Sequence, residues 1–182
     1  MRAAGPVRAA GPVRAAAPPY DRGMVSAQRF GSVFDRLTPL VSAATRAHVA
    51  LYRRTGGRIG HSAPGAPTML LLDHVGARSG IPRTTPLLYL ADGDDLVIVA
   101  SAGGHPRHPA WLHNLRAHPD TTVQARDEVR PVRAREADEA ERARLWPRLD
   151  AMYGSFASYR RRADEAGRVI PLVVLERQAP TP

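Results

Sequence analysis

The chain has 182 residues, a length that fits one domain with some additional chain. It contains no cysteine, which excludes disulfides, thiolate metal sites and a cysteine nucleophile and agrees with a cytoplasmic location. No apolar run approaches the roughly 20 residues that a membrane-spanning helix needs. Its 26 basic residues, all of them arginine, outnumber 17 acidic ones, and the net charge of +9 favours anionic partners such as phosphates.

The N-terminal third divides into two segments. Residues 1–23 repeat a short Arg-Ala-Ala-Gly-Pro-Val unit, and their frequent prolines and small side chains predict a disordered tail. Within 24–56, apolar residues recur at spacings of three and four, which predicts an amphipathic helical segment that Pro39 kinks or divides. This segment either packs on the core or a partner subunit, or lies on the inner surface of the membrane as a peripheral contact.

Residues 57–182 are predicted to form one domain rich in β-structure. Strand patterns cover Met69–Val75, Thr84–Leu90, Leu96–Ser101, Thr121–Ala125, Val129–Arg135 and Val169–Leu175. Helices are expected from Pro109 as first residue, from an Asp138 cap to about Met152 with Pro147 as an interruption, and over Tyr153–Ala166. Hairpin connections and the lack of a Gly-x-Gly-x-x-Gly or Walker pattern exclude a doubly wound sheet. They predict a small barrel or a strongly coiled, mainly antiparallel sheet flanked by helices, an α+β fold.

The connection between the first two strands carries more glycine and charge than a hairpin turn requires. It contains Gly76, Arg78, Ser79, Gly80 and Arg83 within eight residues. Arginine side chains bind phosphate or carboxylate oxygens in pairs, and glycines let backbone N–H groups converge on an anion. We interpret this stretch as an anion cradle; a solvated basic hairpin tip is the alternative.

Two further clusters have the composition of a binding pocket. After Ser101, a Gly-Gly turn leads to a helix with Trp111 and Asn114, so backbone donors there would face the edge of a flat heterocycle. Tyr153, Phe156 and Tyr159 recur at spacings of three and would share one face of a helix. Packing in the core is the alternative interpretation for Trp111 and for the aromatic stripe.

Other chemistries find little support in the sequence. His105, His108, His113 and His118 match no standard ligand spacing, so we expect no metal site. Ser101 lacks the Gly-x-Ser-x-Gly elbow of a hydrolase nucleophile. The arginines are scattered and no nucleic-acid motif occurs, so we expect no nucleic-acid partner.

Taken together, the stretches GARSGIPRTTPLLYLADGDDLVIVASAGGHPRHPAWLHNLRAHPD, ERARLWPRLDAMYGSFASY and IPLVVLE resemble the deazaflavin-dependent nitroreductase family. The resemblance runs from about Met69 to Glu176, with the elements in family order and at family-like spacing. It implies a split β-barrel and coenzyme F420, a deazaflavin with an anionic tail. The implied activity is hydride transfer from reduced F420 to a small electron-poor acceptor such as an enone, quinone or nitro-aromatic compound.

The resemblance also assigns site residues. The tail would bind Ala77, Arg78, Ser79, Gly80 and Arg83, where Ala77 replaces a usual arginine and Arg78 a usual lysine. The remaining cofactor contacts would be Thr84, Thr85, Pro86, Leu87, Leu88, Val99, Ala100, Ser101, Ala102, Ala110, Trp111, Leu112, His113, Asn114 and Phe156. Leu88, Tyr153, Phe156 and Tyr159 would line the acceptor pocket, and Leu88 and Phe156 stand where nitroimidazole-reducing relatives have tyrosine. Ser101 and Tyr159 would polarise the acceptor oxygen as catalytic residues.

Three alternatives accompany this assignment. A split barrel that binds FMN keeps the fold and changes the cofactor, because the single phosphate of FMN needs a smaller cradle. A non-catalytic barrel would bind a hydrophobic or anionic ligand, and a peripheral membrane protein would use the N-terminal helix. The sequence also leaves a homodimer open.

Overall fold

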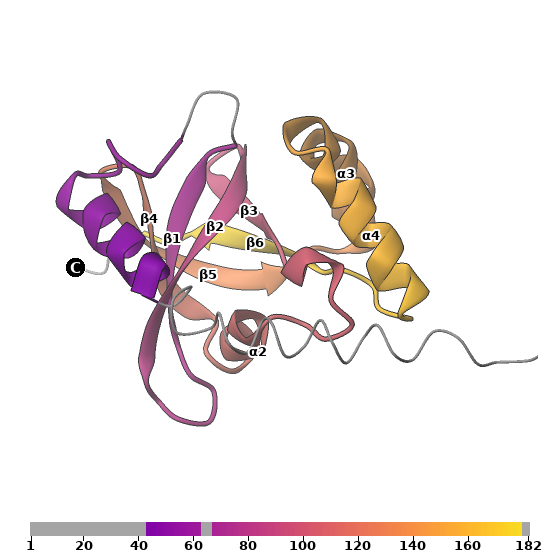
Figure 1. Cartoon of the computed structure of the whole chain (residues 1–182), viewed down its shortest axis with the longest axis horizontal. Helices are drawn as coiled ribbons and strands as arrows, with labels where there is room; N and C mark the ends of the chain where they lie inside the picture. Colours follow the sequence, from indigo (N-terminus) through magenta and orange to yellow (C-terminus); the bar gives the residue numbers. More distant parts are fainter. Residues whose placement is uncertain (1–42, 63–66, 180–182) are drawn as a thin grey trace, which may run out of the picture. The chain divides into compact units, whose positions relative to one another are not determined.

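Six antiparallel strands close into a barrel in the computed structural model, which describes residues 43–62 and 67–179 (Figure 1). The strands are β1 (Met69–Val75), β2 (Pro82–Asp92), β3 (Asp95–Val99), β4 (Asp120–Ala125), β5 (Glu128–Glu136) and β6 (Leu172–Arg177). They follow the order β1-β2-β3-β6-β5-β4, and pairing of Leu72 with Val123 returns β4 to β1. Closure gives each of the six strands two neighbours. The predicted α+β barrel is confirmed.

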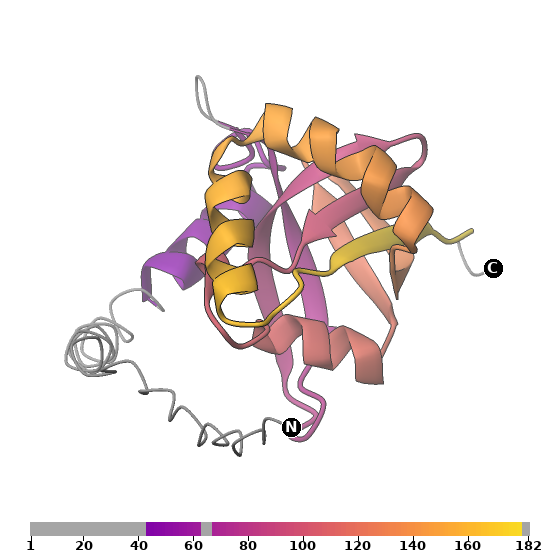
Figure 2. The ribbon, with the colours of Figure 1, turned by 90° about the vertical axis from the view of Figure 1, so that its right-hand side faces the viewer.

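Helices surround this barrel. The first described helix covers 43–54, a 3₁₀ turn η1 covers Ala102–Gly104, and α2 covers Ala110–Ala117. Two further helices, α3 (Glu139–Met152) and α4 (Ser155–Glu165), lie between β5 and β6 in the sequence. Figure 2 shows α2 across one end of the barrel, while α3 and α4 cover a side of it. Residues 1–42 of the predicted tail and helical segment lie outside the described residues.

The residue pattern of each strand reflects what covers its two faces. In β3, Leu96 and Ile98 point into the barrel with β1 and α2, whereas Val97 and Val99 pack under α3 and α4. Because both faces are buried, the strand is apolar throughout. Strand β5 instead alternates buried and exposed residues over its middle, since its outer face meets solvent.

Tyr52 attaches the helix at 43–54 to the barrel. Its side chain is fully buried, and its hydroxyl donates to the Met69 carbonyl at 2.9 Å and accepts from the Arg126 amide at 2.9 Å. Burial raises the pKa of this phenol above its ordinary value. Among the described residues, no helix is both long enough and apolar enough to cross a membrane.

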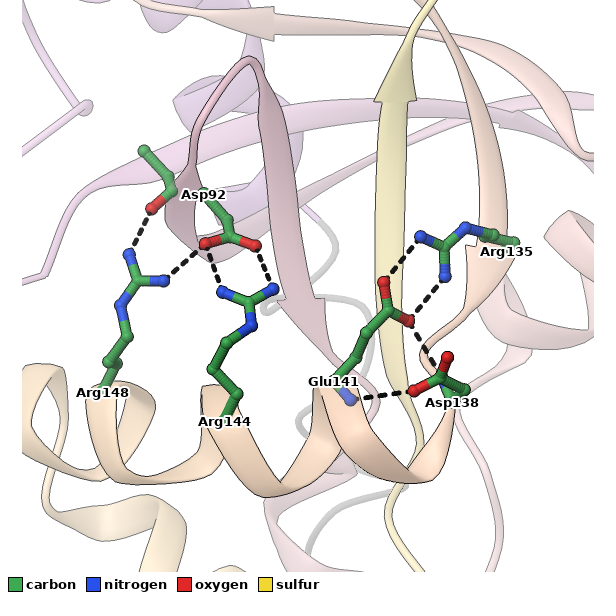
Figure 3. Close-up of polar contacts among 7 residues, drawn as sticks. Asp92, Arg135, Asp138, Glu141, Arg144 and Arg148 are labelled. Atoms are coloured by element: carbon green, nitrogen blue, oxygen red, sulfur yellow. Dashed lines mark hydrogen bonds and ion pairs between the residues drawn. The ribbon is translucent and has the colours of Figure 1, made fainter.

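Helix α3 is anchored at its start and along its length (Figure 3). Asp138 and Glu141 form a capping box, in which the Glu141 amide donates to the Asp138 carboxylate at 2.8 Å. Arg144 and Arg148 both donate to the carboxylate of Asp92 at the end of β2. The expected interruption at Pro147 is therefore wrong. Contacts on either side of this proline, and the buried Leu145 and Leu149 beneath it, keep one continuous helix.

Several strand boundaries differ from prediction by one to three residues, and two of them have a clear physical cause. Strand β3 ends at Val99 instead of Ser101, because the carbonyls of Ala100 and Ser101 accept from Arg168 instead of a ladder partner. Strand β6 starts at Leu172 instead of Val169, since Pro171 has no N–H to donate. Helix α2 begins at Ala110, so that Pro109 is its N-cap and not its first residue.

Candidate active site

The turn between β1 and β2 is a tight loop with two free amides. Of its six amides from Gly76 to Ile81, those of Gly76, Gly80 and Ile81 bond within the turn, and that of Ala77 donates to Asn114 Oδ1 at 2.9 Å. The left-handed backbone of Gly80 (φ 64°) closes the loop. Among the described residues, this leaves the Arg78 and Ser79 amides without a partner.

A cavity of about 680 Å³ opens beside this turn. Its eight lining residues, all within the described ranges, include the exposed Arg78 and Arg83 and no acidic side chain. The first turn of α2 forms the opposite wall with Ala110, His113 and Asn114. Two guanidinium groups, two free amides and no carboxylate make a surface that fits a phosphate or carboxylate group.

A buried relay of hydrogen bonds fixes the wall behind the cavity. The side-chain amide of Asn114 donates to His74 Nδ1 at 2.8 Å, and since that nitrogen accepts, His74 Nε2 carries the proton toward Thr85 Oγ1 at 2.9 Å. Burial, and then the charge of Arg83, hold the pKa of His74 below its ordinary value. A neutral His74 therefore joins β1, β2 and α2 and sets the position of the turn.

The second part of the site is the junction of β3 and η1. Ala102, Gly103 and Gly104 all have positive φ, an unusual conformation for the non-glycine Ala102 (φ 46°). Behind the junction, Arg168 donates to the Ala100 carbonyl at 3.1 Å and to the Ser101 carbonyl at 2.6 Å. With these carbonyls turned toward Arg168, the amides of Ser101, Ala102 and Gly103 have no partner among the described residues.

An aromatic wall lies next to this junction. Tyr153 and Phe156 rings are 5.2 Å apart, and Phe156 and Tyr159 rings are 6.2 Å apart, all in the cluster that contains Val99 and Leu88. A Cβ on Gly104 would lie 2.8 Å from the Tyr159 carbonyl, so glycine is required for this approach of η1 to α4. The structure thus brings together the predicted residues from β2, β3 and α4.

The hydroxyl oxygens of Tyr153 and Tyr159 lie 3.5 Å apart, within hydrogen-bond reach. Bonds from Ser155 and then Tyr159 lower the pKa of Tyr153, while the bond to Tyr153 raises the pKa of Tyr159. The opposite shifts are those expected when the Tyr159 hydroxyl donates to the Tyr153 oxygen.

Several predicted contact residues are turned away from the site. Alternation along β2 directs Leu87 toward the barrel core and Leu88 toward the α3–α4 side, and Thr85 is held by His74. The side chains of these consecutive β2 residues therefore point to both faces of the strand, and their contacts with the cofactor stay a prediction. Other predicted contacts with little or no exposure include Ala100 (0%), Leu112 (1%), Phe156 (4%) and Trp111 (7%). These four pack in the hydrophobic clusters, and their assignment as cofactor contacts stays a prediction.

Sequence reasoning missed two residues that organise the site, His74 and Arg168. The signal for His74 was its position among inward-facing β1 residues, where a polar side chain needs a partner. No comparable signal marked Arg168, because its partners are backbone carbonyls more than sixty residues away in sequence. In the described part of the chain, no three histidine or acidic side chains are grouped so as to hold a metal.

Comparison with known proteins identifies the family. The model of the F420H2-dependent quinone reductase family matches residues 44–177, which is most of the chain. This chain belongs to the F420H2-dependent quinone reductase family. An F420H2-dependent quinone reductase of Mycobacterium tuberculosis is 44% identical over 139 residues, covering 73% of this chain and 89% of the relative. A second one from the same species is 42% identical over 106 residues, or 58% of this chain and 87% of that one.

Solved structures give the same result. An F420H2-dependent reductase is 36% identical to this chain with a TM-score of 0.54, covering 59% of this chain and 93% of that one. A protein solved as a domain-swapped dimer is 31% identical with a TM-score of 0.58, covering 76% and 99%. The family is one of F420-dependent oxidoreductases, so the resemblance to F420-dependent split-barrel enzymes is confirmed and F420 is the cofactor. FMN is not favoured.

Proposed function

We propose that this enzyme transfers a hydride from F420H2 to a quinone. The observation that carries the proposal is the cationic cavity beside the β1–β2 turn in a chain of this family. When bound, reduced F420 supplies the hydride, and the overall reaction of F420H2 with a quinone yields F420 and a hydroquinone without another electron source. The nitro-aromatic and enone acceptors expected from the sequence stay predictions.

The cavity fits the anionic tail of the cofactor. Arg78 and Arg83 would bind its phosphate and carboxylate oxygens, and the free amides of Arg78 and Ser79 would add neutral donors. Ala77 offers no third cation there. Asn114, although predicted as a direct contact, would act by holding the Ala77 amide and therefore the shape of the turn.

The ring of the cofactor and the acceptor would lie between β2, the β3–η1 junction and α4. The unpartnered amides of Ser101, Ala102 and Gly103 would donate to heteroatoms at the edge of a flat ring system. Pro86 and Leu88 on the outer face of β2, together with Val99, would exclude water from it. The hydroxyl of Tyr159 would donate to the acceptor oxygen as negative charge develops there, and the Ser101 hydroxyl would be a second donor.

Two measurements test the proposal. The first is a fluorescence titration of the full chain with oxidised F420 and, separately, with FMN. The second follows oxidation of F420H2 by a water-soluble quinone. We expect micromolar F420 binding, weaker FMN binding and hydroquinone formation. Binding without turnover of any quinone would redirect the search to other acceptors, and failure to bind F420 would contradict the assignment.

The remaining expectations concern partners. A homodimer is proposed on the precedent of the related domain-swapped dimer, and light scattering of the full chain tests it. Membrane contact by the N-terminal segment stays a prediction. In the described part of that segment, the helix face that carries Tyr52 packs against the barrel.

A further inference from the structure

A second cavity lies on the other side of the first turn of α2. It has a volume of about 930 Å³, and its walls come from the η1–α2 connection, α2, the end of β5, the start of α3 and the α4–β6 connection. Figure 2 shows the α4–β6 connection running in front of the barrel above α2. Ala110 and His113 line both this cavity and the cradle cavity, so one helical turn separates the two.

The lining of this cavity has an excess of positive charge, because most of its arginines form no ion pair with another described residue. It contains Arg107, Arg116, Arg142 and Arg168 but a single acidic residue, Glu136. Arg116 takes that carboxylate at 2.7 Å. The other three guanidinium groups have no carboxylate partner in the described part of the chain.

These three arginines differ from the paired arginines elsewhere on the barrel. Arg142 is half-buried and donates to the Ile170 carbonyl at 2.7 Å. Arg168 is 6% exposed, donates only to carbonyls and His108, and leaves its Nε unpartnered. The exposed side chain of Arg107 has no partner among the described residues. Neutral carbonyls orient a guanidinium but leave its charge uncompensated, which is the condition that attracts an anion.

Two neighbouring features point to the same ligand chemistry. Helix α2 starts from Pro109 with no side-chain cap and no acidic residue in its first turn, so its N-terminal amides also favour an anion. Burial, and then the charges of Arg168, Arg116 and His113, hold the pKa of His108 below its ordinary value. Apolar atoms of Pro106, Val169 and Pro171 complete the wall. This combination suits a small organic body that carries several anionic groups.

We propose that this cavity is a second anion site, distinct from the cofactor cradle, which binds a small organic polyanion with at least two carboxylate or phosphate groups. The inference does not depend on the cofactor or on the acceptor. It rests on the three guanidinium groups that line one cavity and have no carboxylate partner among the described residues.

Calorimetric titration of the full chain without cofactor tests the proposal, with citrate as the carboxylate probe and pyrophosphate as the phosphate probe. We expect at least one of them to bind with a Kd below about 1 mM. Arg107→Gln and Arg142→Gln should each weaken that binding about five- to tenfold, the size expected for one charge-assisted contact. The preferred probe identifies the anionic group.

Two matched variants locate the binding. Arg78→Gln removes one charge from the cradle. Arg133→Gln removes one charge from β5, where Arg133 forms an exposed ion pair with Asp120 of β4. Both variants should keep the Kd of the bound probe within about twofold of the unsubstituted chain. Loss of binding in Arg78→Gln alone would assign the anion to the cradle and overturn the proposal. Equal weakening in all four variants would indicate unspecific electrostatic attraction and would overturn the proposal. The proposal would also be overturned if neither citrate nor pyrophosphate binds. Thermal unfolding of Arg142→Gln controls for its bond to Ile170, and Arg107→Gln involves no such bond.

Discussion

Arg168 donates a hydrogen bond to the backbone carbonyl of Ser101 at 2.6 Å across 67 residues of sequence. The same guanidinium takes the Ala100 carbonyl, so it determines where β3 ends and which way the following amides point. It touches neither the proposed acceptor pocket nor the tail cradle. We therefore regard Arg168 as a positioning residue for the ring side of the site.

Substitution of Arg168 should affect stability and cofactor binding separately. Arg168→Met leaves two carbonyls without their donor and should reduce the free energy of unfolding by about 2–4 kcal/mol. Arg168→Lys keeps the charge, but one ammonium group cannot span both carbonyls. We expect Arg168→Lys to fold and to bind F420 about tenfold more weakly, as measured by fluorescence titration. Arg161→Met, on the exposed face of α4, is the control. A destabilised Arg168→Lys with unchanged F420 affinity would limit Arg168 to a structural role.

The cradle predicts both loss and gain of affinity. Arg78→Ala and Arg83→Ala should each weaken F420 binding about tenfold, because each removes a charge-assisted contact worth about 1.5 kcal/mol. Ala77→Arg should tighten binding several-fold by adding a third cation to a cavity that has no acidic residue among its described lining. FMN binding, measured in parallel, should change less, since FMN lacks the longer anionic tail. If Ala77→Arg leaves the F420 Kd unchanged, the tail does not pass this turn.

Tyr159 should contribute to turnover more than to cofactor binding. Tyr159→Phe removes the hydroxyl proposed to donate to the acceptor oxygen and should lower kcat with a soluble quinone about tenfold, with the Kd for oxidised F420 unchanged. Tyr153→Phe is the matched control, since it removes the partner hydroxyl but leaves Tyr159 able to donate. Equal losses of kcat in the two variants would contradict the separate role of Tyr159.

Stability should fall as the solution becomes mildly acidic. Burial lowers the pKa values of His61, His74 and His108, so below about pH 6.5 the unfolded chain binds more protons than the folded one. The stabilisation is complete above that pH and decreases as pH falls toward the folded-state pKa values. Urea unfolding between pH 7.5 and 5 checks the slope, and His74→Gln should reduce it. An unchanged slope in that variant would exclude His74 as a contributor.

The urea experiment stops at pH 5 because the carboxylates in the ion pairs of α3 lose their charge only at lower pH. Hydrogen bonds from Arg135, and then from the Asp138 amide, lower the pKa of Glu141 to about 2. Arg144 and Arg148 likewise hold the pKa of Asp92 well below its usual range.

Pro147 should lower the free energy of unfolding, because it lies inside helix α3 and neither ends nor divides it. It is exposed in the middle of the continuous helix α3, where it removes one backbone hydrogen bond. Pro147→Ala should raise the free energy of unfolding by about 1–2 kcal/mol, less than the full helix-interior cost because proline also restricts the unfolded chain. Thermal unfolding measures the change, with Ala143→Gly as an opposite control. Destabilisation by Pro147→Ala would mean that α3 needs a bend at this residue.

The α+β barrel and its strands were predictable because local patterns carry the information. Alternation and turn residues predicted β1 at its observed bounds and the other five strands to within a few residues. The charged turn at Arg78 also stood out, because its composition exceeded what a connection needs. Which residues of a strand share a face with the site is a question that the local pattern answers less directly. Thr85 and Leu87 point to the other side of β2 from Leu88, and their assignment as cofactor contacts stays a prediction.

The sequence by itself determined the strands, the cradle arginines and, through its motifs, the family. Only the tertiary structure decided which of those residues meet. The link from Asn114 to His74, the hold of Arg168 on Ser101 and the second cationic cavity all join segments far apart in the chain. Such contacts depend on barrel closure and on the placement of α2 and α4. A side chain that bonds to a distant backbone carbonyl leaves no pattern in its own neighbourhood, and this is why Arg168 was not found before the fold was known.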